Sequence, residues 1–263
     1  MFNEEMILDT VLIACNLNKN YYQYYPLCRL VWKHLVGLQP KLVLIADEIP
    51  PYLQPYKDEI ILFPQFNNIN TVFLAQVIRE YFPCVMTESK GIIMSDADML
   101  PMSRRYFLDP IQDCPQDKLV LYRHDVCNDC LEIPMCYVAG SCQAFRNVFK
   151  CETIDDIKRE IQKLADQNEF DGQHGGKGWV VDQRNLFNLV QNHEPQSDLF
   201  RLTDQDTGHL RLDRWHNPND SDVHAQMFTD YHMPRWLPQN WQHVYRIIRA
   251  LLPDVELPVL EFD

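Results

Sequence analysis

The sequence of 263 residues contains little glycine, little basic charge and no long apolar stretch. Only 8 residues are glycine, about 3% of the chain, against a usual share of roughly 7%. No segment matches G-x-x-x-x-G-K-[ST] or G-x-G-x-x-G, so the glycine-rich loops that cradle phosphates are excluded. If this chain binds a nucleotide, another group has to hold the phosphates.

The charge balance excludes some partners. Lys and Arg number 24 and Asp and Glu 37, which gives a formal net charge of −13. Nucleic acids and anionic membranes attract basic surfaces, so we expect neither as a partner. No stretch approaches the ~20 apolar residues of a membrane span. Residues 1–10 contain acidic side chains and lack the basic start of a secretory signal. We therefore expect a cytoplasmic protein, or a soluble part of a longer one.

The nine cysteines are an odd number, and most stand among apolar neighbours, as Cys15 does. This pattern favours reduced thiols in the core. Cys127 and Cys130 form a C-x-x-C pair that Cys136 and Cys142 follow. Four sulfurs so near in sequence leave a zinc site open. A non-enzymatic, zinc-containing binding module is therefore a competing interpretation.

Apolar runs alternate with helical patterns over the first 100 residues. The runs that are typical of buried parallel strands cover residues 9–15, 41–46, 59–63 and 91–95. Apolar residues at helical spacing cover residues 22–38 and 70–82. This alternation predicts an α/β fold with a mostly parallel central sheet flanked by helices.

The second half of the chain is less regular. We expect strands over 118–123 and 133–145, helices over 153–167, 179–192 and 241–252, a glycine-dense loop over 173–178 and a polar stretch over 204–222. Thr153 is a candidate cap for the first of these helices. The sequence contains no repeat, low-complexity tract or linker, so we predict a single domain over residues 1–263.

Two carboxylates, Asp96 and Asp98, follow directly on the apolar run at 91–95. Ligands of parallel α/β sheets bind at the carboxyl ends of the strands. Two desolvated carboxylates repel each other unless a cation lies between them, and their hard oxygens select Mg²⁺ or Mn²⁺. The D-x-D pattern also occurs at 204–206 and 220–222, so the position after a strand carries the prediction. Exposed turn aspartates are the alternative.

The run at 91–101 resembles the D-x-D region of the GT-A fold, nucleotide-sugar-dependent glycosyltransferases. The segments 135–141 and 179–186, the second with the pattern W-x-x-D-Q-x-x-L, are similar to parts of the same superfamily. The resemblance implies a single GT-A (Rossmann-like) domain with a nucleotide-binding half at 1–100. The acceptor-binding half, at 101–263, would hold a smaller β region.

The resemblance also implies a function. It predicts a metal-dependent hexosyl- or pentosyl-transferase that uses Mn²⁺ or Mg²⁺. The donor is a nucleoside-diphosphate sugar, with a UDP-sugar favoured, and the acceptor is a hydroxyl of a glycan, a protein or a small molecule. A nucleotidyltransferase of related fold is an alternative, although residues 14–18 lack the glycine-rich, basic loop usual in that class.

Individual residues receive expected roles from the same resemblance. The metal ligands are Asp96, Asp98 and His232, the last chosen over His216 and His224. The residues expected to contact the nucleotide sugar are Asn16, Tyr21, Asp47, Gln76, Arg79, Asp96, Gly140 and Arg235. Gly140 is expected to allow close backbone approach of a sugar. For each of these residues, ordinary packing or a solvated surface position is the alternative.

Asp182 is the candidate catalytic residue, because the resemblance implies that the W-x-x-D-Q-x-x-L region lies at the head of a helix that faces the acceptor. If the reaction inverts the configuration of the sugar, a carboxylate should accept the proton of the acceptor hydroxyl. If the reaction retains it, Asp182 would instead hold the acceptor. A carboxylate favoured by the helix dipole is the structural alternative.

Overall fold

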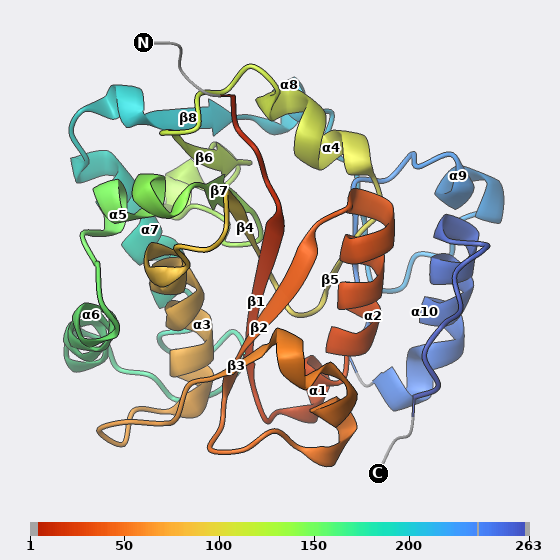
Figure 1. Ribbon diagram of the computed structural model, residues 1–263, viewed down its shortest axis with the longest axis horizontal. Coiled ribbons are helices and arrows are strands. Elements are labelled where there is room, and N and C mark those ends of the chain that lie inside the picture. The colour runs from red at the N-terminus through yellow and green to blue at the C-terminus, as the bar shows by residue number, and fades with distance from the viewer. Residues whose placement is uncertain (1–4, 236, 261–263) are drawn as a thin grey trace.

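A seven-stranded sheet runs through the middle of the molecule in the computed structural model, which describes residues 5–235 and 237–260 (Figure 1). The strand order is β3 (Ile60–Leu62), β2 (Gln39–Ile45), β1 (Thr10–Asn16), β4 (Ile92–Ser95), β7 (Val138–Gly140), β6 (Leu119–Tyr122) and β8 (Leu199–Leu202). Neighbouring strands are parallel except where β7 pairs with β4 and β6. The prediction of a mostly parallel central sheet is confirmed.

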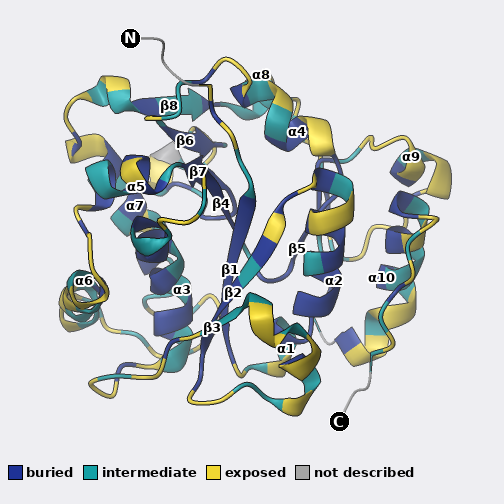
Figure 2. Ribbon diagram, in the orientation of Figure 1, coloured by how far each residue is buried: buried dark blue, intermediate teal, exposed yellow. Residues whose placement is uncertain are grey.

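Helices cover both faces of this sheet (Figure 1). The core on one face contains side chains of α3 (Thr71–Tyr81), α5 (Cys142–Phe149), α6 (Ile154–Gln167) and α7 (Val181–Asn192), and the core on the other contains side chains of α2 (Tyr25–Val31), α4 (Arg104–Leu108) and α10 (Leu237–Leu251). Along β1, Val11 and Ile13 join the core beneath α2, while Leu12 joins the core beneath α3. Both faces of β1 are therefore apolar, which explains the continuous hydrophobic run in its sequence. Figure 2 shows β1 as buried. No described helix is long and apolar enough to cross a membrane.

Local capping explains where several helices begin. The side chain of Asn70 accepts a hydrogen bond from the backbone N–H of Val72 at the start of α3. Thr153 and Asp156 form a capping box at the start of α6, as the sequence predicts for Thr153. The helix predicted over 22–38 is divided into α1 (Lys19–Tyr22), α2 and a π-helical turn (Trp32–Val36). Gly37, at φ 90°, ends this turn.

The prediction of one strand over 133–145 is wrong outside its centre. Only β7 forms there, and α5 begins immediately after it. The hydroxyl of Ser141 accepts a hydrogen bond from the backbone N–H of Ala144 and so caps α5. Phe145 and Val148 then bury one face of this helix. Short apolar runs have no period that separates a strand from a buried helix, which explains the error.

A second sheet of three strands lies beside the main one, in the order β5 (Met99–Pro101), β10 (Asp230–His232) and β9 (Arg211–Leu212). It confirms the expected smaller β region. Residues 204–222 are not a plain polar stretch, because α8 (Asp204–Thr207), β9 and the start of α9 (Asp220–His224) lie within them. Only residues 96–98 separate β4 from β5, so the D-x-D motif lies at the junction of the two sheets.

Candidate functional site

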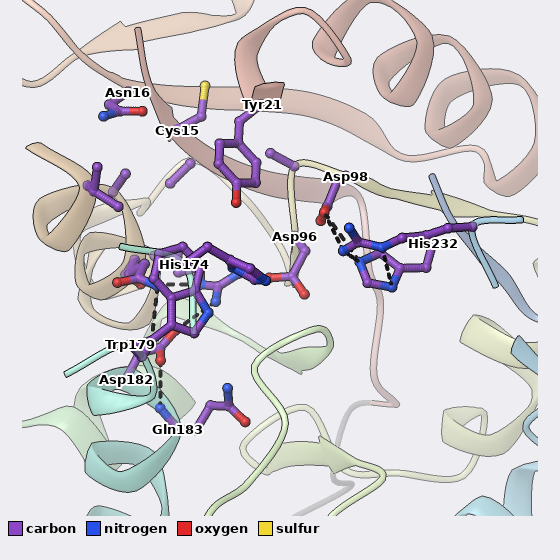
Figure 3. A pocket seen from close by; sticks show the side chains of 17 residues that line it. Cys15, Asn16, Tyr21, Asp96, Asp98, His174, Trp179, Asp182, Gln183 and His232 are labelled. Carbon is purple, nitrogen blue, oxygen red and sulfur yellow. Dashed lines mark hydrogen bonds and ion pairs between the residues drawn. The ribbon is translucent and has the colours of Figure 1, made fainter. Parts of the chain in front are cut away.

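A cavity of about 310 Å³ lies at the carboxyl ends of β1 and β4 (Figure 3). Its walls also include α3, the loop before α7, the first turn of α7 and the edge of the small sheet. The predicted site residues that line it are Asn16, Tyr21, Gln76, Arg79, Asp96, Asp98, Asp182 and His232. The fold therefore gathers residues from distant parts of the chain at the sheet edge where ligands are expected.

Two predicted residues lie elsewhere. Asp47 is exposed after β2 and does not line the cavity. Gly140 pairs with Ile92 at the start of β4, because β7 runs antiparallel to β4, and so it lies at the opposite end of that strand from Asp96. A Cβ at Gly140 would stand 3.1 Å from the Cβ of Ala144, so close packing explains this glycine, and the structure does not support an approaching sugar.

Arg235 does not line the cavity itself, but its charge acts on residues that do. Its guanidinium lowers the pKa of the His174 ring, in addition to the larger effect of burial. It also opposes the rise in pKa that burial causes at Tyr21. Its Nε is buried and has no hydrogen-bond partner among the described residues. Trp236, the next residue in the sequence, lies outside the described residues.

The register of the small sheet brings His232 to the D-x-D motif. His232 stands opposite Met99 in the antiparallel pair of β10 and β5, and the backbone N–H of Met233 donates to the carbonyl of Asp98 at 3.0 Å. As a result, Nε2 of His232 lies 3.3 Å from Oδ2 of Asp98 (Figure 3). By contrast, His224 is exposed on α9 and contacts the carbonyl of Ala250.

Arg214, to which the sequence assigns no site role, joins this pair. It follows β9, which runs parallel to β10, and so reaches the same level as His232. Its Nη2 lies 3.5 Å from Oδ2 of Asp98 and also contacts the ring of His232. Burial of Asp98 favours a raised pKa, but His232 and Arg214 outweigh burial, so the pKa of Asp98 is lowered. Asp98 is therefore a carboxylate at neutral pH.

Arg79 joins the other two carboxylates of the cavity. It lies in the last turn of α3, where its Nη1 pairs with Oδ1 of Asp96 and its Nη2 lies 2.7 Å from Oδ2 of Asp182. Asp182 is 2% exposed, and its Oδ1 accepts a hydrogen bond from the backbone N–H of Gln183 at 2.9 Å. Charge-assisted bonds of this kind are strong, so Arg79 ties α3, α7 and the D-x-D motif together.

The chemistry of Asp98 and His232 fits a divalent cation. Neighbouring ligands of an octahedral ion with bonds of roughly 2.1 Å stand about 3 Å apart, close to the separation of 3.3 Å between Oδ2 and Nε2 here. Asp96 lines the same cavity but is paired with Arg79. Within the described residues, no group of three or more His, Cys, Asp or Glu side chains is arranged to hold a metal ion.

The cysteines form no such group either, as far as the chain is described. Cys130 is exposed and Cys127 is half-buried, whereas Cys136 and Cys142 are buried. The thiol of Cys142 donates to the backbone carbonyl of Cys84 at 3.1 Å. These positions give the zinc-containing binding module no support.

The loop before α7 contributes cavity residues that the sequence does not predict. Half of the chain's 8 glycines fall within residues 172–178 of this loop. His174 and Trp179 both line the cavity, with ring centroids 4.4 Å apart and an interplanar angle of 84° (Figure 3). Gln183, in the first turn of α7, also lines it. The sequence predicts this glycine-dense loop, and the concentration of glycine in a glycine-poor chain is the signal that could have assigned it to the site.

Hydrogen bonds give the loop a defined shape. The carboxylate of Asp171 accepts from the backbone N–H groups of Gln173 and Lys177, both at 2.9 Å. A Cβ at Gly176 would stand 2.5 Å from this carboxylate, so the close approach requires glycine. The side-chain amide of Gln76 donates to the backbone carbonyl of Trp179 at 3.1 Å, which attaches the end of the loop to α3.

The strand order and the two sheets correspond to the fold of the GT-A glycosyltransferases. No protein-family model and no curated protein matches the sequence. Among solved structures, the chain is similar to the galactosyltransferase LgtC in complex with donor and acceptor sugar analogues. The identity is 10%, the match covers 95% of this chain and 97% of that one, and the TM-score is 0.51. The fold assignment rests on this similarity.

Two further solved structures have lower TM-scores. GlyE, a glycosyltransferase of Streptococcus pneumoniae TIGR4, is 14% identical, with 97% of this chain and 65% of that one covered and a TM-score of 0.47. Mouse xyloside xylosyltransferase 1 is 12% identical, with 86% and 97% covered and a TM-score of 0.45.

Proposed function

We propose that this protein is a metal-dependent glycosyltransferase. It moves a sugar from a nucleoside-diphosphate sugar, with a UDP-sugar preferred, to a hydroxyl of a glycan, protein or small-molecule acceptor. One observation carries the proposal: in a GT-A fold, Asp96, Asp98 and His232 meet arginine side chains in one cavity at the carboxyl ends of β1 and β4. This is the sheet edge at which α/β proteins bind ligands.

The cavity offers a place for the diphosphate. Asp98 and His232, with Asp96 beside them, would hold Mn²⁺ or Mg²⁺. When bound, such an ion stabilises the negative charge that develops on a leaving diphosphate. Arg235 does not line the cavity but adds positive charge near it, because its guanidinium acts on the pKa values of His174 and Tyr21. A cation and arginines thus take the role of the missing glycine loop.

The nucleoside lies, in this proposal, against β1 and α3. Figure 3 shows the hydroxyl of Tyr21 pointing into the cavity, where it can bond a ribose or a base. The amide of Asn16 donates to Oγ1 of Thr71 at 3.1 Å, which fixes the orientation of the side chain at the cavity wall. The amide of Gln76 is engaged with Trp179, so we assign Gln76 to holding the loop in place.

Asp182 has a positioning role in this proposal. A general base has to lie within reach of the proton that it accepts. Both oxygens of Asp182 already accept hydrogen bonds, from Arg79 and from the backbone of Gln183, and the residue is almost fully buried. We therefore assign to Asp182 the role of orienting Arg79, and through it Asp96.

Binding of UDP tests the metal site. We expect calorimetric titration to show UDP binding in Mn²⁺ that is much weaker in a chelator, and Asp98→Asn to remove this dependence on metal. Asp222→Asn is the matched control, because Asp222 belongs to another D-x-D sequence, on α9, and does not line the cavity. Tight binding of UDP by Asp98→Asn without metal, equal to that of the unmodified protein, would overturn the proposed site.

A product assay separates the proposal from a nucleotidyltransferase. A panel of nucleotide sugars is incubated with Mn²⁺, and the release of nucleoside diphosphate is followed. Release of UDP from at least one UDP-sugar is the expected result. A nucleotidyltransferase would instead form a nucleotide sugar from a sugar phosphate and a nucleoside triphosphate, and would release pyrophosphate. Pyrophosphate release without any nucleoside diphosphate would therefore replace our assignment with that class.

A further inference from the structure

Arg214 contacts the same two side-chain atoms that would bind a divalent cation. Its Nη2 lies 3.5 Å from Oδ2 of Asp98 and contacts Nε2 of His232. These two atoms are themselves 3.3 Å apart and form the pair that fits a metal ion. A guanidinium only donates hydrogen bonds, so it takes up lone pairs that metal ligands need to have free.

We propose that Arg214 is a built-in substitute for the divalent cation. In the metal-free protein it neutralises Asp98 and occupies His232, and it has to leave both side chains before a cation binds. Once released, its guanidinium is available to the diphosphate of the donor. This inference rests on the proposed function, because it concerns the same site.

The contacts of the two cavity arginines explain why Arg214 is the one that exchanges. Arg79 is held by Asp96 and by Asp182, whose side chain is 2% exposed. In the described part of the chain, the guanidinium of Arg214 has no hydrogen bond or ion pair beyond Asp98 and His232. Arg214 also stands in the turn after β9, with its side chain 19% exposed. Its long side chain can therefore swing away without breaking the core.

The charges around the cavity support the exchange. The carboxylates that line it are Asp96, Asp98 and Asp182, and the guanidiniums are Arg79 and Arg214, so one negative charge is left over. A divalent cation adds two positive charges, which match the two negative charges of a nucleoside-diphosphate sugar. While Arg214 stays on Asp98, it both blocks and repels the cation. Arg214 therefore weakens binding of the metal alone and strengthens binding of the diphosphate.

The test measures Mn²⁺ binding and UDP binding separately in Arg214→Gln. For Mn²⁺ alone, titrated by calorimetry or electron paramagnetic resonance, we expect binding about tenfold tighter than in the unmodified protein, equal to about 1.4 kcal/mol. For UDP at saturating Mn²⁺ we expect binding about tenfold weaker. Opposite changes in the two affinities would not arise from a structural defect, which would weaken both.

Two further variants keep the test decisive. Arg214→Lys retains the charge but loses the planar fork of donors, so we expect tighter Mn²⁺ binding with most of the UDP affinity kept. If Arg214→Gln does not fold, Arg214→Lys takes its place in the measurement of Mn²⁺ binding. Arg246→Gln is the matched control, because Arg246 pairs with Asp220 on the outer helices and does not line the cavity. We expect it to leave both affinities unchanged.

The outcomes distinguish this inference from the proposed function. If Arg214→Gln and Arg214→Lys bind Mn²⁺ no more tightly than the unmodified protein, while Asp98→Asn loses Mn²⁺, the role of Arg214 is overturned and the proposed metal site stands. If neither the unmodified protein nor Arg214→Gln binds Mn²⁺, even with UDP present, both are overturned.

Discussion

Replacing Arg79 with Met tests whether one guanidinium stabilises two carboxylates of the cavity. Arg79 is 12% exposed at its side chain and pairs with Asp182, which is 2% exposed, and with Asp96, which is 30% exposed. Methionine keeps most of the length of the side chain but cannot donate a hydrogen bond. Asp182 is then left as a buried carboxylate whose remaining hydrogen bond comes from the backbone of Gln183.

The magnitude follows from these exposures. Removing one partner of a buried ion pair costs about 3–5 kcal/mol, because the other charge stays buried without compensation. Water reaches Asp96 and compensates part of its loss, so we take the lower end, about 3 kcal/mol. At about 2–4 °C per kcal/mol for a protein of this size, the melting temperature should fall by about 6–12 °C.

The assay is urea and thermal denaturation at pH 7 in a chelator, so that bound metal does not contribute. Arg159→Met is the matched control, because Arg159 pairs with Asp156 on the surface of α6, and we expect no measurable loss there. In the double variant with Asp182→Leu, both buried charges are gone and part of the stability should return. A loss below about 1 kcal/mol for Arg79→Met would refute the reasoning, since buried pairs cost more to break.

Three other predictions concern stability and the loop. Burial, and then the charge of Asp182, raise the pKa of Glu80 well above its usual value, so the folded state keeps a proton that the unfolded chain loses above about pH 4.3. The free energy of unfolding should therefore fall by up to about 1.4 kcal/mol per pH unit above that pH. Urea titrations at several pH values should show that Glu80→Gln removes this dependence on pH. The same pH dependence in Glu80→Gln and the unmodified protein would contradict the prediction. Ser141→Ala should cost about 1 kcal/mol in the same titrations, because α5 loses its cap, and an unchanged midpoint would exclude that role. Gly176→Ala should weaken UDP binding in Mn²⁺, because the new methyl group displaces the carboxylate of Asp171 that shapes the loop; unaltered affinity would mean that the loop does not serve the donor.

Patterns that depend on local burial and local hydrogen bonds could be predicted from the sequence. The apolar runs at β1, β2 and β4 reflect parallel strands that are covered on both faces and therefore need no polar side, whereas the run at β3 forms a partly exposed edge strand. Asn70 and Thr153 mark the starts of α3 and α6, because their side chains bond to the backbone of the next turn. The position of Asp96 and Asp98 after β4 then placed them at the edge of the sheet where ligands bind.

The contacts within the cavity were decided by the tertiary structure. His232 meets Asp98 through the register of β10 on β5, and Arg214 joins them because β9 pairs with β10. The short strands of this sheet carry no clear periodic pattern, so neither the pairing nor its register is visible in the sequence. Gly140 was predicted to approach a sugar, but the direction of β7 places it at the other end of β4.

The sequence by itself thus determined the fold class, the position of the D-x-D motif and several helix starts, because apolar patterns and caps can be identified from residues that are close in the chain. The tertiary structure alone decided that Arg79 bridges Asp96 and Asp182 and that Arg214 lies against Asp98 and His232. These pairs depend on how distant helices and strands pack and in which register they align. No local pattern specifies that alignment.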